Sequence, residues 1–185
     1  MDYKKIENNQ KKKVALIGCG LIGQSWAISF LNAGFCVSLF DPGKGVTAQA
    51  KEKIEAKLSD LQVNGLIKKT NISDYLAKIH LAEDISSAVR DSIHIQESGP
   101  EDLDVKNELT KKIDAVAAEN IPIASSTSGI PASLYASDVK GQYRCLVAHP
   151  INPPHLIPAV EIVPAPFTST SITEAVKDII ISIDK

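Results

Sequence analysis

The amino-acid sequence predicts an α/β protein with a doubly wound, mostly parallel sheet that carries helices on both faces. Short apolar runs typical of buried strands alternate with helical segments along most of the chain. The first of these runs breaks into glycines within "VALIGCGLIG", residues 14–23, where a doubly wound fold makes its first strand-to-helix turn. We expect one domain over residues 13–185, preceded by a polar, lysine-rich and flexible lead-in over residues 1–12.

The first three elements form one strand-helix-strand unit. Residues 13–18 are typical of a buried strand, residues 21–34 of a helix closed by Gly34, and residues 35–41 of a second buried strand. Parallel strands joined by a helix in this way are the repeating unit of a doubly wound sheet.

The remaining elements continue the alternation. Ile54, Leu58 and Leu61 recur at helical spacing, which predicts an amphipathic helix over residues 45–65. A second helix is expected over residues 101–120, with Leu109, Ile113 and Val116 on one face. Further helical segments are expected at 85–91 and 171–185, and short strands at 78–84, 92–98, 121–127, 143–149 and 159–165.

Composition and charge exclude several classes of protein. The net charge of −2 and pI of about 6.1 give no general attraction to nucleic acid or to an anionic membrane. No apolar run reaches the ~18 residues of a membrane span, and the charged N-terminus does not resemble a signal peptide, so we expect a cytoplasmic protein. Cys19, Cys36 and Cys145 lie far apart in apolar stretches, which favours reduced buried thiols and no metal site.

The glycines at positions 18, 20 and 23 have the spacing of a dinucleotide-binding loop. The first makes the tight turn, the second admits a pyrophosphate, and the third lets helix and strand pack closely. Asp41 ends the second strand about 20 residues later, where this Rossmann fingerprint places an acid for the ribose hydroxyls. We therefore expect NAD rather than NADP. Two interpretations of the nearby Lys44 stay open: it weakens this preference for NAD, or it is a solvated surface charge. The expected contacts within the loop are Gly18, Gly20, Leu21, Ile22 and Gly23.

Three further stretches place polar residues directly after buried strands, at 94–106, 125–133 and 147–163. Because ligands bind at the carboxyl ends of the strands in an open parallel sheet, we expect these stretches and the glycine loop to surround one cleft.

These four stretches, in this order, resemble the 3-hydroxyacyl-CoA dehydrogenase family, and within it the branch of lambda-crystallin, L-gulonate 3-dehydrogenase and L-carnitine dehydrogenase. The resemblance implies a catalytic histidine at His149 in "AHPINP", paired with Glu161 in "AVEIV". It implies substrate contacts from Ser128 in "SSTSG" and from Asn152. It also implies that NAD is contacted by three residues, Glu101, Lys106 and Ser128.

The chemistry of alcohol oxidation is consistent with these roles. A base must remove the hydroxyl proton as hydride leaves for the nicotinamide, and an imidazole titrates near neutrality. Taken one by one, a histidine after a strand is more often structural, and "STS" is more often a helix-capping turn. We interpret His80 and His94 as strand residues and Glu97 as a structural or cofactor-side acid, and expect His155 to be close enough to line the same cleft.

The sequence is consistent with three functions. The leading hypothesis is an NAD-dependent dehydrogenase of small polar 3-hydroxy acids, gulonate-like or carnitine-like, because the segment over residues 44–79 is shorter than the basic helical insert of the acyl-CoA enzymes. The alternatives are a 3-hydroxyacyl-CoA dehydrogenase of fatty acid metabolism and a non-catalytic NAD-binding or structural domain. The resemblance also implies a C-terminal helical domain that forms a homodimer, which we expect to be absent from a chain ending at Lys185.

Overall fold

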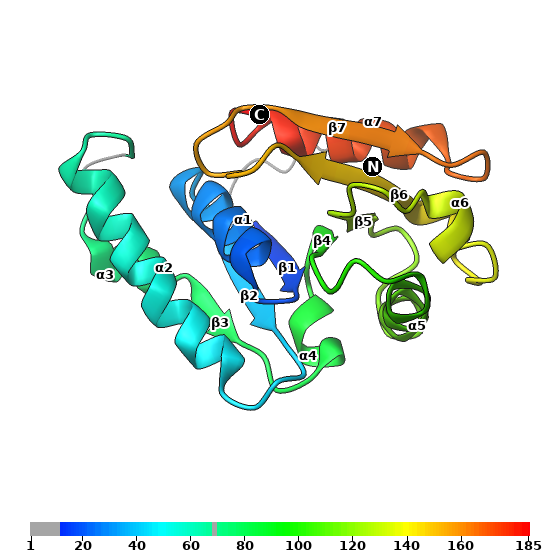
Figure 1. Cartoon of the computed structure of the whole chain (residues 1–185), viewed down its shortest axis with the longest axis horizontal. Helices are drawn as coiled ribbons and strands as arrows, with labels where there is room; N and C mark the ends of the chain where they lie inside the picture. Colours follow the sequence, from blue (N-terminus) through cyan, green and yellow to red (C-terminus); the bar gives the residue numbers. More distant parts are fainter. Residues whose placement is uncertain (1–11, 68–69) are drawn as a thin grey trace.

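A seven-stranded sheet forms the centre of the molecule in the computed structural model, which describes residues 12–67 and 70–185. The expected lead-in thus lies almost wholly outside the described residues. The strand order is β3-β2-β1-β4-β5-β6-β7 (Figure 1). The strands are β1 (Lys13–Ile17), β2 (Cys36–Phe40), β3 (Ile79–Leu81), β4 (His94–Glu97), β5 (Ile123–Ser125), β6 (Cys145–Pro150) and β7 (Val160–Pro164).

Neighbouring strands from β3 to β6 pair in parallel, and β7 pairs antiparallel with β6, which confirms the mostly parallel sheet. The chain winds outward from β1 through β2 to β3, and on the other side from β4 to β7. The winding direction therefore reverses between β1 and β4, and a crevice opens at the carboxyl ends of strands at such a reversal.

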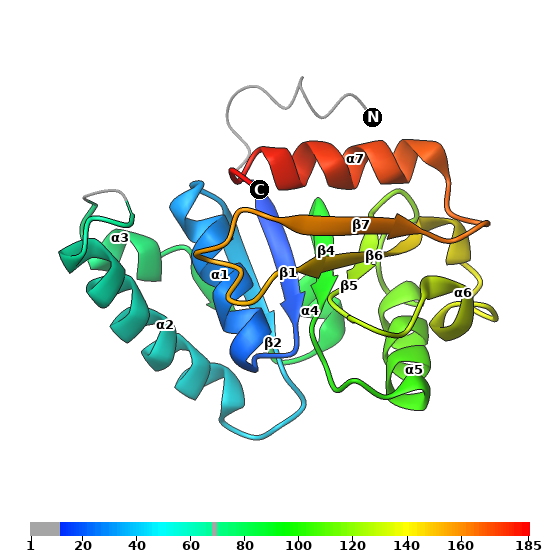
Figure 2. The same cartoon turned by 45° about the horizontal axis from the view of Figure 1, so that its top comes forward.

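Helices cover both faces of the sheet, as predicted. They are α1 (Leu21–Asn32), α2 (Val46–Val63), α3 (Ile72–Leu76), α4 (Ile85–Val89), α5 (Leu103–Asp114), α6 (Ala132–Tyr135) and α7 (Thr170–Ile181), with a 3-10 turn at Gln142–Arg144. Val14 and Leu16 of β1 pack into a core shared with α1, α2 and α7, whereas Ala15 and Ile17 pack into a second core with α4 and α6. Alternate β1 side chains thus fill the two cores. Figure 2 shows α7 lying along β7.

The expected amphipathic helix over 45–65 is confirmed as α2, with Ile54, Leu58 and Leu61 buried. The helix expected over 101–120 is wrong at its C-terminal end. The observed α5 stops at Asp114, and Val116 is 46% exposed. The short helices α3 and α6 were not expected.

The early end of α5 has a cause in tertiary structure. Arg144 is buried and forms an ion pair of 2.6 Å with Asp114. Its guanidinium also donates to the backbone carbonyl groups of Asp114 and Ala118. These carbonyl oxygens are therefore engaged by a side chain distant in sequence, and the chain turns rather than continuing as a helix.

The cysteines are free thiols, of which Cys19 and Cys145 are buried and Cys36 is only half-buried. Burial is the main cause that raises the pKa of both buried thiols to about 12, so they are protonated at neutral pH. None of the helices within the described ranges is long and apolar enough to cross a membrane.

The buried His94 predicts a pH-dependent stability. Its complete burial lowers its pKa from 6.5 to about 4. Between these two pH values, His94 binds a proton in the unfolded chain but stays neutral in the folded chain. The part of the free energy of unfolding that depends on His94 is therefore complete above pH 6.5 and falls as the pH decreases. The slope should approach ~1.4 kcal/mol per pH unit. Urea unfolding of the parent and of His94→Leu across this range checks it, because the variant should show a shallower dependence; equal slopes would contradict the assignment.

Candidate functional site

The glycine loop joins β1 to α1, and each of its three glycines meets a different constraint. Gly18 has φ +95°, and a Cβ there would lie 2.6 Å from the backbone oxygen of Ser98. A Cβ on Gly23 would lie 2.0 Å from the oxygen of Gly18. A Cβ on Gly20 would meet nothing within 4 Å. The first and third glycines therefore serve close packing, and the second leaves open space in front of the helix.

That open space suits a phosphate. Gly20 is the N-cap residue of α1, no side chain caps the helix, and its first turn carries no acidic residue. The amide groups of Leu21, Ile22 and Gly23 thus lie at the positive end of the helix dipole, where anions are stabilised. The residues present fit the pyrophosphate of a dinucleotide, held by the N-terminus of α1.

Asp41 lies directly after β2 and is tied to the same loop. Its Oδ2 accepts a hydrogen bond of 2.9 Å from the Cys19 amide, and its Oδ1 accepts one of 2.9 Å from the Gly43 amide. Parallel pairing of Ile17 with Phe40 brings the two segments together. Each oxygen of the half-buried carboxylate has lone-pair capacity left, so Asp41 can hold the loop and still accept from ribose hydroxyls.

His149 and Glu161 face each other across the antiparallel pair β6 and β7, where they are direct partners in the register. The Nδ1 atom of His149 lies 2.7 Å from Oε2 of Glu161. An ionised carboxylate accepts the proton on Nδ1, which leaves Nε2 as the unprotonated nitrogen of the neutral ring. The structure thus brings together the two residues of the expected catalytic pair.

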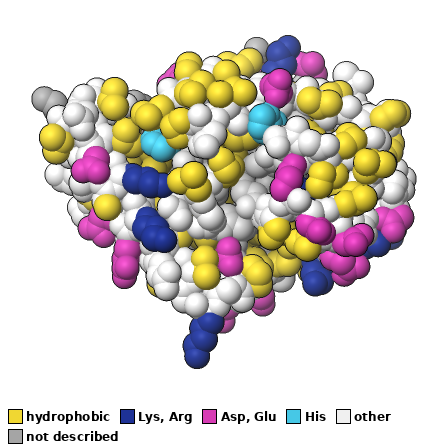
Figure 3. Space-filling view, in the orientation of Figure 1, with side chains coloured by type: hydrophobic (Ala, Val, Ile, Leu, Met, Phe, Trp, Pro, Cys, Tyr) yellow, Lys and Arg dark blue, Asp and Glu magenta, His cyan; other side chains and the backbone are white. Residues whose placement is uncertain are grey.

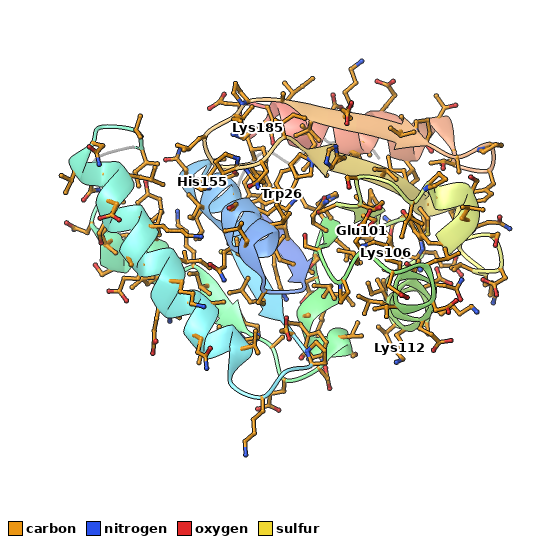
Figure 4. The ribbon with its side chains drawn as sticks, viewed as in Figure 1. Trp26, Glu101, Lys106, Lys112, His155 and Lys185 are labelled. Atoms are coloured by element: carbon orange, nitrogen blue, oxygen red, sulfur yellow. The ribbon has the colours of Figure 1, made fainter. Side chains whose placement is uncertain are left out.

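Asn152 follows His149 on the loop between these strands, which is closed by a backbone hydrogen bond from Ile151 to Ala159. The peptide bond between Asn152 and Pro153 is cis. Beyond it the chain turns toward α1, where the Ser29 hydroxyl donates to the Pro154 carbonyl group. His155 is carried away with this turn and does not line the cleft, contrary to expectation (Figure 4). Burial first, and then nearby Lys57 and Lys185, lower its pKa.

Glu101 organises the turn that carries Ser128. One of its oxygens, Oε1, accepts from the Thr127 hydroxyl at 2.6 Å and from the Ser128 and Gly129 amides at 3.1 and 3.0 Å. Partial burial alone would raise the pKa of Glu101, but these hydrogen bonds and the charge of Lys106 together hold it below its ordinary value. Glu101 is therefore ionised at neutral pH and keeps Ser128 at the edge of the cleft.

Lys106 is almost completely buried, although it contributes to the lining of the cleft described below. It is 1% exposed, and its Nζ lies 3.0 Å from Glu97 and 3.7 Å from Glu101. Glu97, also 1% exposed, further accepts from the Ser125 hydroxyl and the Gly99 amide. Figure 4 shows Glu101 and Lys106 side by side between β4 and α5. The structure gives Glu97 a structural role, and Lys106 contributes positive charge to the floor of the cleft.

One cleft of about 330 Å³ is lined by six of the twelve expected site residues. Figure 3 shows the surrounding face, on which acidic side chains gather over α5. Glu161 does not line the cleft itself but contacts His149, and of the expected glycine-loop residues only Ile22 lines it, with Asp41 bonded to the loop at Cys19. Sequence reasoning did not single out Ser98 and Ser126, although both lie within the polar stretches 94–106 and 125–133 and directly follow the observed β4 and β5. The lining residues are Ile22, Ser98, Gly99, Glu101, Lys106, Ser126, Ser128, His149, Pro150, Ile151 and Asn152.

Comparison with known proteins identifies the family. The model of the 3-hydroxyacyl-CoA dehydrogenase NAD binding domain matches residues 13–185. This chain belongs to the 3-hydroxyacyl-CoA dehydrogenase family. The matched domain is the one that binds NAD, so NAD is the cofactor. Among the described residues, no group of three or more His, Cys, Asp or Glu side chains is placed to hold a metal ion.

Relatives from two named activities and from the crystallins match at similar identity. The chain is 41% identical over 160 residues to a 3-hydroxyacyl-CoA dehydrogenase of Gibberella moniliformis, covering 86% of this chain and 48% of that protein. It is 38% identical over 160 residues to a lambda-crystallin homolog of Bos taurus, covering 84% and 49%. It is 35% identical over 152 residues to an L-carnitine dehydrogenase of Streptomyces coelicolor, covering 82% and 46%. The chain spans about half the length of these relatives.

Solved structures confirm the fold. The (S)-3-hydroxybutyryl-CoA dehydrogenase from Ralstonia eutropha superposes with a TM-score of 0.88 at 23% identity, over 95% of this chain and 62% of that one. The 3-hydroxybutyryl-CoA dehydrogenase from Escherichia coli gives 0.87 at 23% identity, over 96% and 37%. The doubly wound sheet predicted from the sequence is therefore the Rossmann-like fold of these structures.

Two glycine substitutions separate packing from ligand access. Gly23→Ala should lower the free energy of unfolding by about 1–3 kcal/mol or more, because its Cβ meets the Gly18 carbonyl group. Gly20→Ala should leave stability nearly unchanged but weaken NADH binding about tenfold or more, because its methyl group obstructs charge-assisted bonds to a phosphate. Thermal melts and calorimetric titration check both. If Gly20→Ala binds NADH as tightly as the parent does, a phosphate does not bind at the N-terminus of α1.

A third substitution tests the choice of cofactor. Asp41→Asn keeps a side-chain acceptor near Cys19 but removes the negative charge that repels a 2'-phosphate. NADH should bind less tightly and NADPH relatively better, so the ratio of their dissociation constants should move toward one by about tenfold. Lys44→Gln, on the exposed surface nearby, is the control and should change this ratio much less. If Asp41→Asn discriminates as the parent does, Asp41 is not the ribose partner.

Proposed function

We propose that the whole protein is an NAD-dependent dehydrogenase that oxidises a 3-hydroxy group to a ketone, with His149 as the base. One observation carries this proposal. His149, joined to Glu161 at 2.7 Å, lines a cleft whose lining extends to Ile22 at the start of α1. A base and a dinucleotide loop at the same cleft are the two requirements for hydride transfer from an alcohol.

Each of the residues at the cleft has its own role in the proposed reaction. Glu161 accepts the Nδ1 proton of His149 and so keeps Nε2 free to take the hydroxyl proton of the substrate. As the imidazolium forms, the carboxylate of Glu161 stabilises its charge. The Ser128 hydroxyl and the Asn152 amide donate hydrogen bonds to the substrate oxygen as it becomes a carbonyl oxygen. NAD, when bound, supplies the nicotinamide that accepts the hydride.

The proposed substrate is a small polar 3-hydroxy acid, gulonate-like or carnitine-like. The L-carnitine dehydrogenase relative supports this choice, and so do the exposed polar side chains of Asn152 and Ser128 at the cleft. The relative named 3-hydroxyacyl-CoA dehydrogenase, at 41% identity, favours an acyl-CoA instead. Comparing kcat/KM of the whole protein for L-carnitine, L-gulonate and 3-hydroxybutyryl-CoA distinguishes the two classes.

A non-catalytic role is the second candidate, favoured by the similarity to a lambda-crystallin homolog. The paired His149 and Glu161 favour the enzyme, because a purely structural protein has no need of an imidazole oriented by a carboxylate beside a cleft. We further propose a homodimer and a cytoplasmic location for the whole protein. The family resemblance supports the homodimer, and within the described residues no helix is long and apolar enough to cross a membrane.

The catalytic pair makes distinct predictions for its two members. His149→Ala should lower kcat by about 10²–10⁴-fold, because the base is lost. Glu161→Gln should lower kcat less, by about 10–100-fold, because the imidazole remains but loses the charge that orients it. His80→Gln, on an exposed position of β3, is the matched control and should leave kcat unchanged. NADH formation followed by absorbance measures all three, and an unchanged rate in His149→Ala would refute the mechanism.

A further inference from the structure

A hydrogen-bonded network of largely buried side chains extends to the cleft and finishes at Ser126 and Ser98. Ser98 directly follows β4 and Ser126 directly follows β5, and their hydroxyl oxygens lie 2.9 Å apart. Both residues line the cleft together with His149. Either serine alone could be the donor in this contact, so the rest of the network has to decide its direction.

The donor and acceptor in each hydrogen bond of the network can be assigned starting from Gln96, because its neighbours determine the orientation of its side-chain amide. The Ala148 carbonyl oxygen can only accept, so the Gln96 atom that faces it at 3.1 Å is Nε2. Oε1 then faces Nε2 of His94 at 3.0 Å and accepts its proton. Because burial lowers the pKa of His94 to about 4, the ring is neutral with a single proton. Its unprotonated Nδ1, an acceptor in this tautomer, has no hydrogen-bond partner within the described part of the chain.

Ser126 receives two hydrogen bonds at its hydroxyl oxygen. Gln96 Nε2 donates to it at 2.7 Å, and the indole Nε1 of Trp26 donates at 3.1 Å. A hydroxyl oxygen has two lone pairs, and both are now used. The remaining contact, to Ser98 Oγ, is therefore one in which Ser126 donates. Ser98 accepts it, and the hydrogen of its own hydroxyl group is left to point into the cleft.

The position of Ser98 indicates what this hydrogen meets. The backbone oxygen of Ser98 would lie 2.6 Å from a Cβ on Gly18, and its own Cβ 3.9 Å from a Cβ on Gly23. Ser98 thus lies against the glycine loop, between the start of α1 and His149. The ribose partner Asp41 lies on the other side of the loop, after β2. A dinucleotide with its phosphates at α1 therefore passes Ser98 with its nicotinamide half.

We propose that Ser98 is a cofactor-binding residue whose hydroxyl group donates a hydrogen bond to an oxygen of the nicotinamide half of NAD. The buried set of His94, Gln96, Trp26 and Ser126 orients this donor before the cofactor binds. A donor oriented in advance loses less entropy on binding than a freely rotating hydroxyl group. This inference rests on the proposed function only in that it requires NAD to bind at the glycine loop.

Calorimetric titration of this chain with NADH and with ADP tests the proposal. Ser98→Ala should weaken NADH binding about 3- to 10-fold, as expected for one hydrogen bond, and should leave ADP binding unchanged because ADP lacks the nicotinamide half. Ser92→Ala, which removes another buried hydroxyl group, bonded to the Ala88 carbonyl group, is the matched control and should affect neither ligand. Unchanged NADH binding by Ser98→Ala, or an equal loss for ADP, would overturn the proposal.

The orienting network has its own test. Trp26→Phe frees a lone pair on Ser126, so Ser98 can donate to Ser126 instead of to the cofactor. The effect of Ser98→Ala on NADH binding should therefore be smaller in the Trp26→Phe background, whereas additive losses would overturn the orientation argument. If Trp26→Phe does not fold in a thermal melt, Ser98→Ala alone decides. A folded parent protein that does not bind NADH would overturn the cofactor site itself. That result differs from a parent that binds NADH together with a Ser98→Ala variant that binds it equally well.

Discussion

The backbone of the glycine loop lies directly against the backbone that follows β4, and a Cβ on Gly18 would lie 2.6 Å from the Ser98 oxygen. This close approach lies where the winding of the sheet reverses, which is the place of a ligand in doubly wound proteins. It aligns the N-terminus of α1 with the cleft and sets Ser98 beside the loop. The position of a bound dinucleotide relative to His149 depends on this contact.

A buried charge network supports the opposite wall of the cleft. Glu97 and Lys106 are both 1% exposed and lie 3.0 Å apart, so each charge is compensated by the other inside the protein. Further donors from Ser125 and Gly99 satisfy the remaining capacity of the Glu97 carboxylate. Lys106 then approaches Glu101, whose hydrogen bonds hold the turn with Ser128. The network therefore links the end of β4, the start of α5 and the substrate side of the cleft.

The proposed catalytic pair, His149 and Glu161, depends on the antiparallel edge of the sheet. Directly opposed residues of an antiparallel pair have their Cβ atoms about 4.5–5.5 Å apart. Placing His149 opposite Glu161 thus brings imidazole and carboxylate into contact without a loop to position either. A shift of one residue in the register would turn Glu161 to the other face of β7. The rigid pairing of β6 with β7 orients His149 before any substrate arrives.

The sequence by itself determined the sheet class, the glycine loop with Asp41, the amphipathic α2 and, through family resemblance, the His149–Glu161 pair. These features are local or carried by motifs, because apolar periodicity and glycine spacing act over a few residues. Only the tertiary structure decided that α5 ends at Asp114, where Arg144 engages its carbonyl groups, that His155 turns away from the cleft, and that Lys106 is paired with Glu97. It alone decided the direction of the hydrogen bond between Ser126 and Ser98. Each of these outcomes depends on groups far apart in the sequence competing for one partner, and such competition leaves no periodic signal in the chain.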